Sequence, residues 1–415
     1  MALSASVAQA VTAFALQQGI YRGSCRQCRL ALTLLINLKG SYLSLPMTAP
    51  QYARPWRACA FAVVRRNIAN AVRNADGELR SREIAMQNIP VIDLQAFRKD
   101  GPAAFDSAAI DKAALVEACE DHGFFLLVNH GCDAQVHDVF AAAADFFAMP
   151  RAQKTAVYRD AENPLGYYDR ELTKQRRDQK EVFDFKAGGH ISRNPLRHTR
   201  WPEQPDHFRP ALTEFFTAFT ELAETTMRMV LSGLGLPADA VDSTMERGFG
   251  PAHTSAARLN FYPAQDPVPA AERESVTSLG DMALHHHTDP GAMTLLLQDD
   301  CGGLQARSRA HGWIDVPPLA GAIVVNIGDI LQVWTNDRCT AGVHRVVPIT
   351  SPQGRLSIPF FYQPKVDAVV EPWLAAEEIP HYRAFSWQEY IRGRVTDNYS
   401  DLGEEDIQID RYKVA

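Results

Sequence analysis

The sequence predicts a mixed protein in which a region of alternating helices and strands leads into a mainly β core. In residues 86–250, apolar residues with helical spacing alternate with short stretches typical of buried strands. In residues 251–395, short β-branched or aromatic runs are separated by Gly, Pro and Asp, and no long helix intervenes. That spacing favours an antiparallel sandwich or barrel, such as a jelly roll, with flanking helices. Residues 396–415 are expected to form a C-terminal tail.

Composition and charge place the chain among ordinary globular proteins. Of its 415 residues, 46% are hydrophobic and 22% are charged, which excludes a disordered, collagen-like or coiled-coil chain. No apolar run approaches the roughly 18 residues that cross a bilayer, so we expect no membrane span. The formal net charge of -7 offers no basic face for nucleic acid. Seven scattered cysteines, with a lone CxxC at Cys25 and Cys28, support zinc only weakly and favour a reducing, cytoplasmic location.

The first 85 residues differ from the rest in charge. They carry eleven basic residues against three acidic ones, whereas the remainder of the chain is acidic. We expect residues 1–85 to be a basic extension that is disordered or not essential, because ordered structure is first predicted just after Met86. The alternative is an organelle-targeting segment, since such segments are also Arg-rich and poor in acidic residues.

The first half of the ordered region is predicted to contain helices and buried strands. Apolar side chains recur at helical spacing in 107–122, and Gly123 is expected to end that helix. The basic residues of 170–181, including Arg177 and Lys180, indicate a solvated loop or helix face, with attraction of an acidic substrate as the alternative. In chain order, the expected elements are a strand at 89–94, a helix at 107–122, a strand at 124–128, and helices at 134–147 and 210–234.

The second half is predicted to be built mainly from short strands. A helix at 387–394 is expected to cover the core or to mediate a dimer. Aromatic residues after Tyr362, such as Trp373 and Trp387, fit either the wall of an apolar pocket or the core. The expected strands lie at 259–263, 293–298, 303–307, 322–327, 330–335, 343–347 and 356–363.

Three side chains in this half form a candidate metal site. On a strand, residues i and i+2 face the same way, so His287 and Asp289 can converge on one ion, and His285 shares their face. His344 lies in an apolar strand 57 residues after His287. Two imidazoles and one carboxylate leave open positions on an octahedral metal, which suits non-haem Fe(II) with a co-substrate and O2. Zinc accepts the same ligands, usually in a four-coordinate site.

A candidate anion site follows on a later strand. Arg355 and Ser357 share one strand face. A buried guanidinium needs an anionic partner, and its planar pair of N–H donors matches the two oxygens of a carboxylate. A dicarboxylic 2-oxo acid could chelate the metal through its oxo group and near carboxylate while Arg355 and Ser357 hold the far carboxylate. Asn260 and Tyr262, which alternate on an earlier strand, are candidates for hydrogen bonds to the near carboxylate.

Several motifs occur in a fixed order along residues 88–395. They include NFYP at 260–263, HTDPG at 287–291 and RLS at 355–357, with further matching stretches at 89–94, 122–131, 294–298, 302–305, 325–329, 334–337 and 344–346. In order and spacing these stretches resemble the isopenicillin N synthase-like family of iron(II)- and 2-oxoglutarate-dependent dioxygenases, and nothing in residues 1–85 matches it. The resemblance implies a double-stranded β-helix core. It also implies the iron ligands His287, Asp289 and His344, and 2-oxoglutarate contacts at Arg355, Ser357, Asn260 and Tyr262.

The resemblance further implies an activity. The expected enzyme binds Fe(II), 2-oxoglutarate and O2, releases succinate and CO2, and hydroxylates, desaturates or cyclises a small organic metabolite. Two alternatives stay open: an Fe(II)-dependent oxidase of the same family that does not use 2-oxoglutarate, and a catalytically silent ligand-binding jelly roll. We expect a small-molecule substrate, no nucleic-acid or membrane partner, and a monomer or weak homodimer.

Overall fold

The computed structural model describes residues 89–160, 162–173, 176–187, 198–374, 377–397 and 408–414. The expectations for the basic extension at 1–85, and for most of the tail at 396–415, therefore concern residues outside this description. Within the described residues, helices and strands are mixed, and the strands gather into one large and one smaller sheet together with two short pairs.

Eight strands of the described residues form the large sheet, and all its neighbours pair antiparallel except β1 and β2. Strands from both halves of the chain contribute to it, so the two halves share one sheet. In spatial order its members are β1 (Val91–Asp93), β2 (Phe124–Val128), β12 (Ile323–Ile327), β9 (Met293–Gln298), β14 (Arg355–Tyr362), β7 (Ala256–Tyr262), β6 (Glu181–Phe185) and β3 (Gly166–Tyr168).

The smaller sheet is antiparallel throughout. Within the described part of the chain its four strands run in the order β11 (Gly312–Asp315), β10 (Leu304–Ser308), β13 (His344–Val346) and β8 (Leu284–His287). The two short pairs are β4 (Leu172–Thr173) with β5 (Arg176–Arg177), and β15 (Val369–Val370) with β16 (Phe385–Ser386).

Helices connect and cover these sheets. None of the helices among the described residues combines the length and the apolarity needed to cross a lipid bilayer. The α-helices are α4 (Leu94–Asp100), α5 (Ala103–Asp106), α6 (Lys112–Asp121), α7 (Asp133–Ala148), α8 (Arg151–Thr155), α9 (Phe208–Gly233), α10 (Ala238–Gly248), α11 (Asp329–Trp334) and α12 (Trp387–Asp397). Short 3-10 turns are η1 (Gly250–Ala252), η2 (Ala270–Ser275) and η3 (Ile409–Tyr412).

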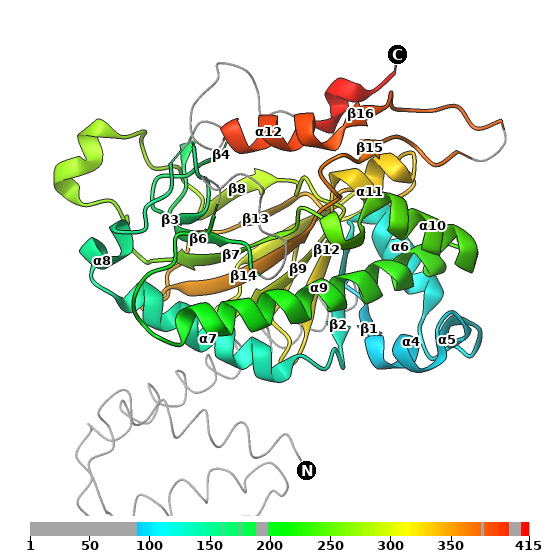
Figure 1. Ribbon diagram of the computed structural model, residues 1–415, viewed down its shortest axis with the longest axis horizontal. Coiled ribbons are helices and arrows are strands. Elements are labelled where there is room, and N and C mark those ends of the chain that lie inside the picture. The colour runs from blue at the N-terminus through cyan, green and yellow to red at the C-terminus, as the bar shows by residue number, and fades with distance from the viewer. Residues whose placement is uncertain are drawn as a thin grey trace, which may run out of the picture. The chain divides into compact units, whose positions relative to one another are not determined.

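The large sheet presents two different faces. Against one face lie α7 and α9, side by side in Figure 1, and Phe216 and Phe219 of α9 pack on Phe360 of β14 with ring centroids 5.2 and 6.2 Å away. The other face packs on the smaller sheet, because Leu296 of β9 and Leu304 of β10 belong to one buried cluster. In each central strand, side chains therefore point alternately toward the helices and toward the space between the two sheets.

Most predicted elements are confirmed. The predicted strand at 124–128 and the helices at 134–147 and 210–234 match β2, α7 and α9 to within two residues at either end. The first predicted strand, 89–94, is shorter than expected. Its end is set by Asp93, whose carboxylate accepts a 2.9 Å hydrogen bond from the backbone N–H of Gln95 and so caps α4.

The strand predicted at 330–335 is wrong, because these residues form α11. A short apolar run is too brief for its length to distinguish a helix from a strand. A helix that is buried on nearly every side also lacks the polar face that would show a repeat of 3.6 residues in the sequence. The buried side chains of α11 are Asp329, Ile330, Leu331, Val333 and Trp334.

Gly123 joins α6 to β2 with a φ of +72°, and a Cβ there would lie 2.4 Å from the carbonyl oxygen of Thr340. We expect Gly123→Ala to lower the free energy of unfolding by about 3 kcal/mol, because left-handed strain and a backbone clash add together. Gly312→Ala is the matched control: its φ is also +72° but no atom lies within 4 Å of the added Cβ, so it should cost only about 1 kcal/mol. Urea unfolding followed by circular dichroism measures both, and equal losses would contradict the clash.

Candidate active site

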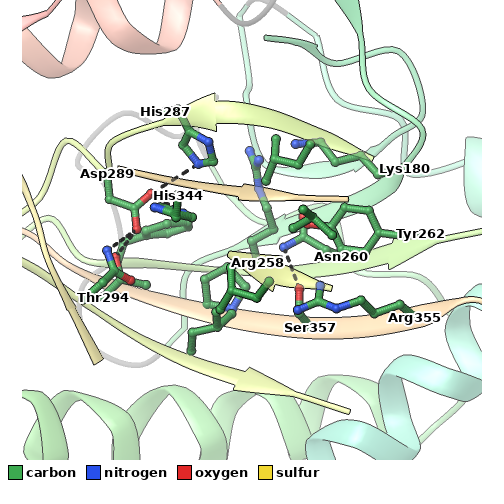
Figure 2. Close-up of a pocket in the computed structure, with 17 residues that line it drawn as sticks. Lys180, Arg258, Asn260, Tyr262, His287, Asp289, Thr294, His344, Arg355 and Ser357 are labelled. Carbon is green, nitrogen blue, oxygen red and sulfur yellow. Dashed lines mark hydrogen bonds and ion pairs between the residues drawn. The ribbon is translucent and has the colours of Figure 1, made fainter. Parts of the chain in front are cut away.

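A cavity of about 480 Å³, its open mouth included, lies between the two sheets (Figure 2). The smaller sheet contributes Leu284, His287, Leu304, His344 and Val346 to its lining. The large sheet contributes Arg258, Asn260, Tyr262, Thr294, Leu296, Asn326, Arg355, Ser357, Pro359 and Phe361, and the connections add Lys180 and Asp289.

Three potential metal ligands converge in this cavity, as predicted from the sequence. The donor atoms of His287, Asp289 and His344 all lie within 4.8 Å of one another. Oδ1 of Asp289 is 3.7 Å from Nε2 of His287 and 3.9 Å from Nε2 of His344. Antiparallel pairing of β8 with β13 places the two imidazoles opposite each other, with ring centroids 4.3 Å apart.

Each imidazole is held through Nδ1, the ring nitrogen that faces away from the other two candidate metal ligands. Nδ1 of His287 lies 2.9 Å from the carbonyl oxygen of His285, and Nδ1 of His344 lies 2.8 Å from that of Gly342. A carbonyl only accepts, so Nδ1 carries the proton in both rings and Nε2 keeps its lone pair for a metal. Desolvation of the partly buried ring and the neighbouring His344 lower the pKa of His287 to about 3, which keeps its imidazole neutral.

The carboxylate of Asp289 is oriented in the same way by the large sheet. Its Oδ2 accepts a 2.6 Å hydrogen bond from Oγ1 of Thr294 on β9 and a 3.0 Å bond from Nδ2 of Asn326 on β12. These bonds leave Oδ1 directed at the imidazoles (Figure 2). Burial alone would raise the pKa of Asp289, but His344, His287 and the two hydrogen bonds together lower it, so the group is an anion.

The loop that carries Asp289 is fixed from outside the cavity. The backbone N–H of Asp329, at the start of α11, donates to the carbonyl oxygen of Asp289 over 2.9 Å. From α12, Arg394 donates to the carbonyl oxygen of Thr288 over 2.7 Å, and Tyr390 donates to the Asp329 carboxylate over 2.5 Å. The predicted helix at 387–394 therefore exists as α12, and it braces this loop.

The predicted anion site lies at another part of the same cavity. Arg355 is almost fully buried, and its Nε and Nη2 donate to the carbonyl oxygen of Gly302 and to Oε1 of Gln298 at 2.7 and 3.3 Å. Its Nη1 has no hydrogen-bond partner among the described residues. Antiparallel pairing sets Arg355 opposite Tyr262 and Ser357 opposite Asn260, as predicted for a shared face.

An orphaned donor in this part of the cavity, Nη1 of Arg355, fits a carboxylate ligand. Nδ2 of Asn260 reaches Oγ of Ser357 at 3.5 Å, while Oδ1 of Asn260 is buried without a partner in the described structure. A buried guanidinium N–H that has no acceptor is costly. An anionic ligand would supply the acceptor that Nη1 of Arg355 lacks.

The prediction that 170–181 is a solvated face is wrong for Arg177 and Lys180. Both are nearly inaccessible, because Arg177 forms a two-fold ion pair with Asp266, and Lys180 contacts Glu171 and Asp178. Lys180 also lines the cavity. The segment folds into β4, β5 and the start of β6 rather than a helix, and it packs Arg177 and Lys180 inward against acidic partners.

Sequence reasoning missed Lys180 and Arg258 as cavity residues. A signal for Arg258 was present, because it precedes Asn260 and Tyr262 by two and four positions on one strand and so shares their face. His285 was predicted to face the metal group, but its ring nitrogens contact Asp178 and Asp281, each at 3.2 Å.

The aromatic residues after Tyr362 belong to the core. Trp387, Tyr382 and Tyr390 are fully buried among other apolar side chains, and Trp373 stacks on Trp334 with ring centroids 4.9 Å apart. None of these residues lines the cavity that the described residues form. The core interpretation of this stretch is therefore the right one.

Comparisons with known proteins agree with this geometry. A family model described as non-haem dioxygenase in morphine synthesis N-terminal matches residues 89–204, and the 2OG-Fe(II) oxygenase superfamily model matches residues 253–364. The chain is 32% identical to gibberellin 20 oxidase 2 of Oryza sativa subsp. japonica, over 76% of this chain and 78% of the relative. It is 29% identical to homoarginine-6-hydroxylase 2-ODD-233 of the same subspecies, over 75% of this chain and 97% of the relative.

Solved structures are similar as well. JOX2 in complex with 2OG, Fe and JA matches with a TM-score of 0.63 and 27% identity, over 79% of this chain and 89% of that one. A full-length Neurospora crassa protein in complex with alpha-KG and thymine matches with a TM-score of 0.62 and 26% identity, over 75% of this chain and 97% of that one. The chain therefore belongs to the 2OG-Fe(II) oxygenase superfamily. It is a dioxygenase whose cofactors are Fe(II), 2-oxoglutarate and O2.

The hydrogen bond from Thr294 gives a test of how Asp289 is oriented. We expect Thr294→Val to weaken divalent metal binding by about 10-fold to 100-fold, because the carboxylate loses a partner that fixes its direction. Thr226→Val is the control, since Thr226 is equally buried but bonds only to the carbonyl oxygen of Leu222 in α9. Anaerobic Fe(II) titration measures the affinity. Equal affinities of the two variants would show that the Thr294 bond does not orient Asp289.

Proposed function

We propose that this protein oxidises a small organic metabolite by hydroxylation, desaturation or ring closure, with conversion of 2-oxoglutarate to succinate and CO2. One observation carries the proposal. Three metal-ligand atoms with free lone pairs share a cavity with a buried guanidinium N–H that lacks an acceptor among the described residues. A metal and a carboxylate co-substrate together satisfy both sets of atoms.

His287, Asp289 and His344 would hold the iron through Nε2, Oδ1 and Nε2. Two imidazoles and one carboxylate match the donor set of non-haem Fe(II) oxygenases, in which other positions stay open. When bound, the iron supplies the activation of O2 that no amino-acid side chain provides. The task of the three residues is to keep one face of the metal occupied and the opposite face free.

Arg355 and Ser357 would bind the far carboxylate of 2-oxoglutarate. Nη1 of Arg355 offers a charge-assisted hydrogen bond, and Oγ of Ser357 lies one strand position further along the same face. Asn260 and Tyr262, which lie opposite them on β7, would donate further hydrogen bonds to the co-substrate. The walls between the two sheets exclude bulk water from these contacts, which strengthens each of them.

We also infer that the two sheets form a double-stranded β-helix, the arrangement expected from the sequence. Antiparallel pairing within both sheets and a ligand cavity between them support this description. The large sheet is then extended by β1 and β2 at one edge and by β6 and β3 at the other.

A small-molecule substrate fits the relatives, whose names indicate chemically different small substrates. They include oxidases of gibberellin, a hydroxylase of homoarginine, and a structure that contains thymine. We propose a substrate of comparable size that binds beside the iron and away from Arg355, in a monomer or weak homodimer.

Arg355 decides between this proposal and an oxidase that does not use 2-oxoglutarate. We expect Arg355→Gln to weaken Fe(II)-dependent binding of 2-oxoglutarate by about 10-fold to 100-fold, the effect of losing a charged hydrogen bond. Isothermal titration under anaerobic conditions measures binding, and succinate release after O2 addition measures turnover. Arg338→Gln is the control, since Arg338 pairs with Glu120 and is not among the cavity residues.

Substrate oxidation that stays at full activity in the Arg355 variant would favour the oxidase. Absence of metal-dependent 2-oxoglutarate binding in the unmodified protein, together with no turnover, would favour the silent ligand-binding alternative and reject the proposed function.

A further inference from the structure

Gln298, on β9, is an uncharged side chain that contacts the buried guanidinium of Arg355, and the function proposed above gives it no part. Antiparallel pairing of β9 with β14 sets Gln298 opposite Ser357, which in turn lies opposite Asn260 on β7. Figure 2 shows the guanidinium of Arg355 beside Ser357. Gln298 also shares its strand face with Leu296, which lines the cavity. It therefore belongs to the surroundings of the predicted anion site.

Two hydrogen bonds fix the amide of Gln298 in one orientation. Its Nε2 donates to the carbonyl oxygen of Val316 over 3.2 Å, and its Oε1 accepts from Nη2 of Arg355 over 3.3 Å. A carbonyl oxygen can only accept and a guanidinium can only donate, so an exchange of the amide oxygen and nitrogen would break both bonds. Gln298 therefore presents an uncharged acceptor to Arg355.

The contacts that hold Arg355 leave its charge unbalanced. Its Nε donates to the carbonyl oxygen of Gly302 over 2.7 Å, its Nη2 donates to Gln298, and its Nη1 lacks a partner in the described part of the chain. Arg159 and Arg177 are almost as deeply buried, but each contacts a carboxylate oxygen, at 2.8 and 2.7 Å. Buried cations are usually paired in this way, so Arg355 is the exception among these three.

A carboxylate at position 298 would remove this exception. Glu is nearly the same size as Gln, and the adjacent guanidinium favours the charged form of a carboxyl group. A guanidinium pairs strongly with a carboxylate, so the charge of Arg355 would be matched within the protein. The far carboxylate of 2-oxoglutarate would then approach a like charge, which is unfavourable. The neutral amide of Gln298 avoids both effects.

We propose that Gln298 is a positioning residue that keeps the charge of Arg355 available to the co-substrate. It holds Nη2 with a neutral acceptor, and in this way it sets the preference of the site for a dicarboxylic 2-oxo acid over one whose far end is uncharged. This inference rests on the proposed function, because Gln298 acts through the contact between Arg355 and the far carboxylate.

Two variants separate the charge at position 298 from the side chain itself. Gln298→Glu adds a carboxylate, whereas Gln298→Met keeps a similar length, adds no charge and leaves Arg355 unbalanced. Gln305→Glu is the matched control. Oε1 of Gln305 accepts from Nε of Arg345 over 2.9 Å, so this variant also sets a carboxylate beside an arginine, but neither residue is among those that line the cavity.

Each protein is loaded with Fe(II) without O2 and titrated by calorimetry with 2-oxoglutarate. A second titration uses 2-oxopentanoate, which has the same carbon chain with a methyl group in place of the far carboxylate. We expect Gln298→Glu to bind 2-oxoglutarate about 10-fold to 100-fold more weakly, the size of a lost charged hydrogen bond, with nearly unchanged binding of Fe(II) and 2-oxopentanoate. The unmodified protein, Gln298→Met and Gln305→Glu should keep their preference for 2-oxoglutarate.

Unchanged 2-oxoglutarate binding in Gln298→Glu, or equal weakening of both acids, would overturn the role of Gln298. Loss of the preference in Gln298→Met would overturn it too, since the side chain rather than its neutrality would then matter, and this variant decides the question if Gln298→Glu folds poorly. Loss of the preference in Gln305→Glu would show that the effect is not specific to position 298. Failure of the unmodified protein to bind 2-oxoglutarate is a different result, because it rejects the proposed function itself.

Discussion

The active site depends on one cross-strand contact, the pairing of His287 on β8 with His344 on β13. These residues are 57 positions apart in the sequence, and the antiparallel register of the smaller sheet places their rings 4.3 Å apart. A shift of one residue in that register would turn one imidazole to the opposite face of the sheet. The pairing of the two strands therefore decides whether a metal-binding face exists.

The third ligand makes the site a product of both sheets. The smaller sheet supplies the imidazoles, whereas Thr294 and Asn326 of the large sheet orient the carboxylate of Asp289. A buried carboxylate without such partners would be strongly unfavourable. The metal-binding group therefore needs both sheets, and α11 and α12 further fix the connecting loop with hydrogen bonds.

Strand alternation predicted that Arg355 and Ser357 share a face, because i and i+2 positions of one strand do so whatever the tertiary fold. The same rule placed His287 and Asp289 together, but Asp289 lies in the loop after β8, and His285, which the rule also included, contacts Asp178 and Asp281 instead. Lys180 could not be predicted in the same way. Its local sequence is basic and looks solvated, and its burial depends on carboxylates, such as Glu171, whose position only the folded chain reveals. The helix α11 was not predicted for a related reason, because burial on nearly all sides leaves no helical alternation of apolar and polar residues in its sequence.

The two cationic parts of the cavity differ in how their charge is balanced. Among the described residues, Arg355 donates only to neutral acceptors, which are a backbone carbonyl and the amide oxygen of Gln298. Its positive charge is therefore not balanced by a carboxylate of these residues. Lys180 and Arg258 already contact carboxylates, so an added anion gains less Coulomb energy there. Hydrogen bonds to Gly302 and Gln298 hold Arg355, and carboxylates hold Lys180 and Arg258, so the protein itself orients all three cations.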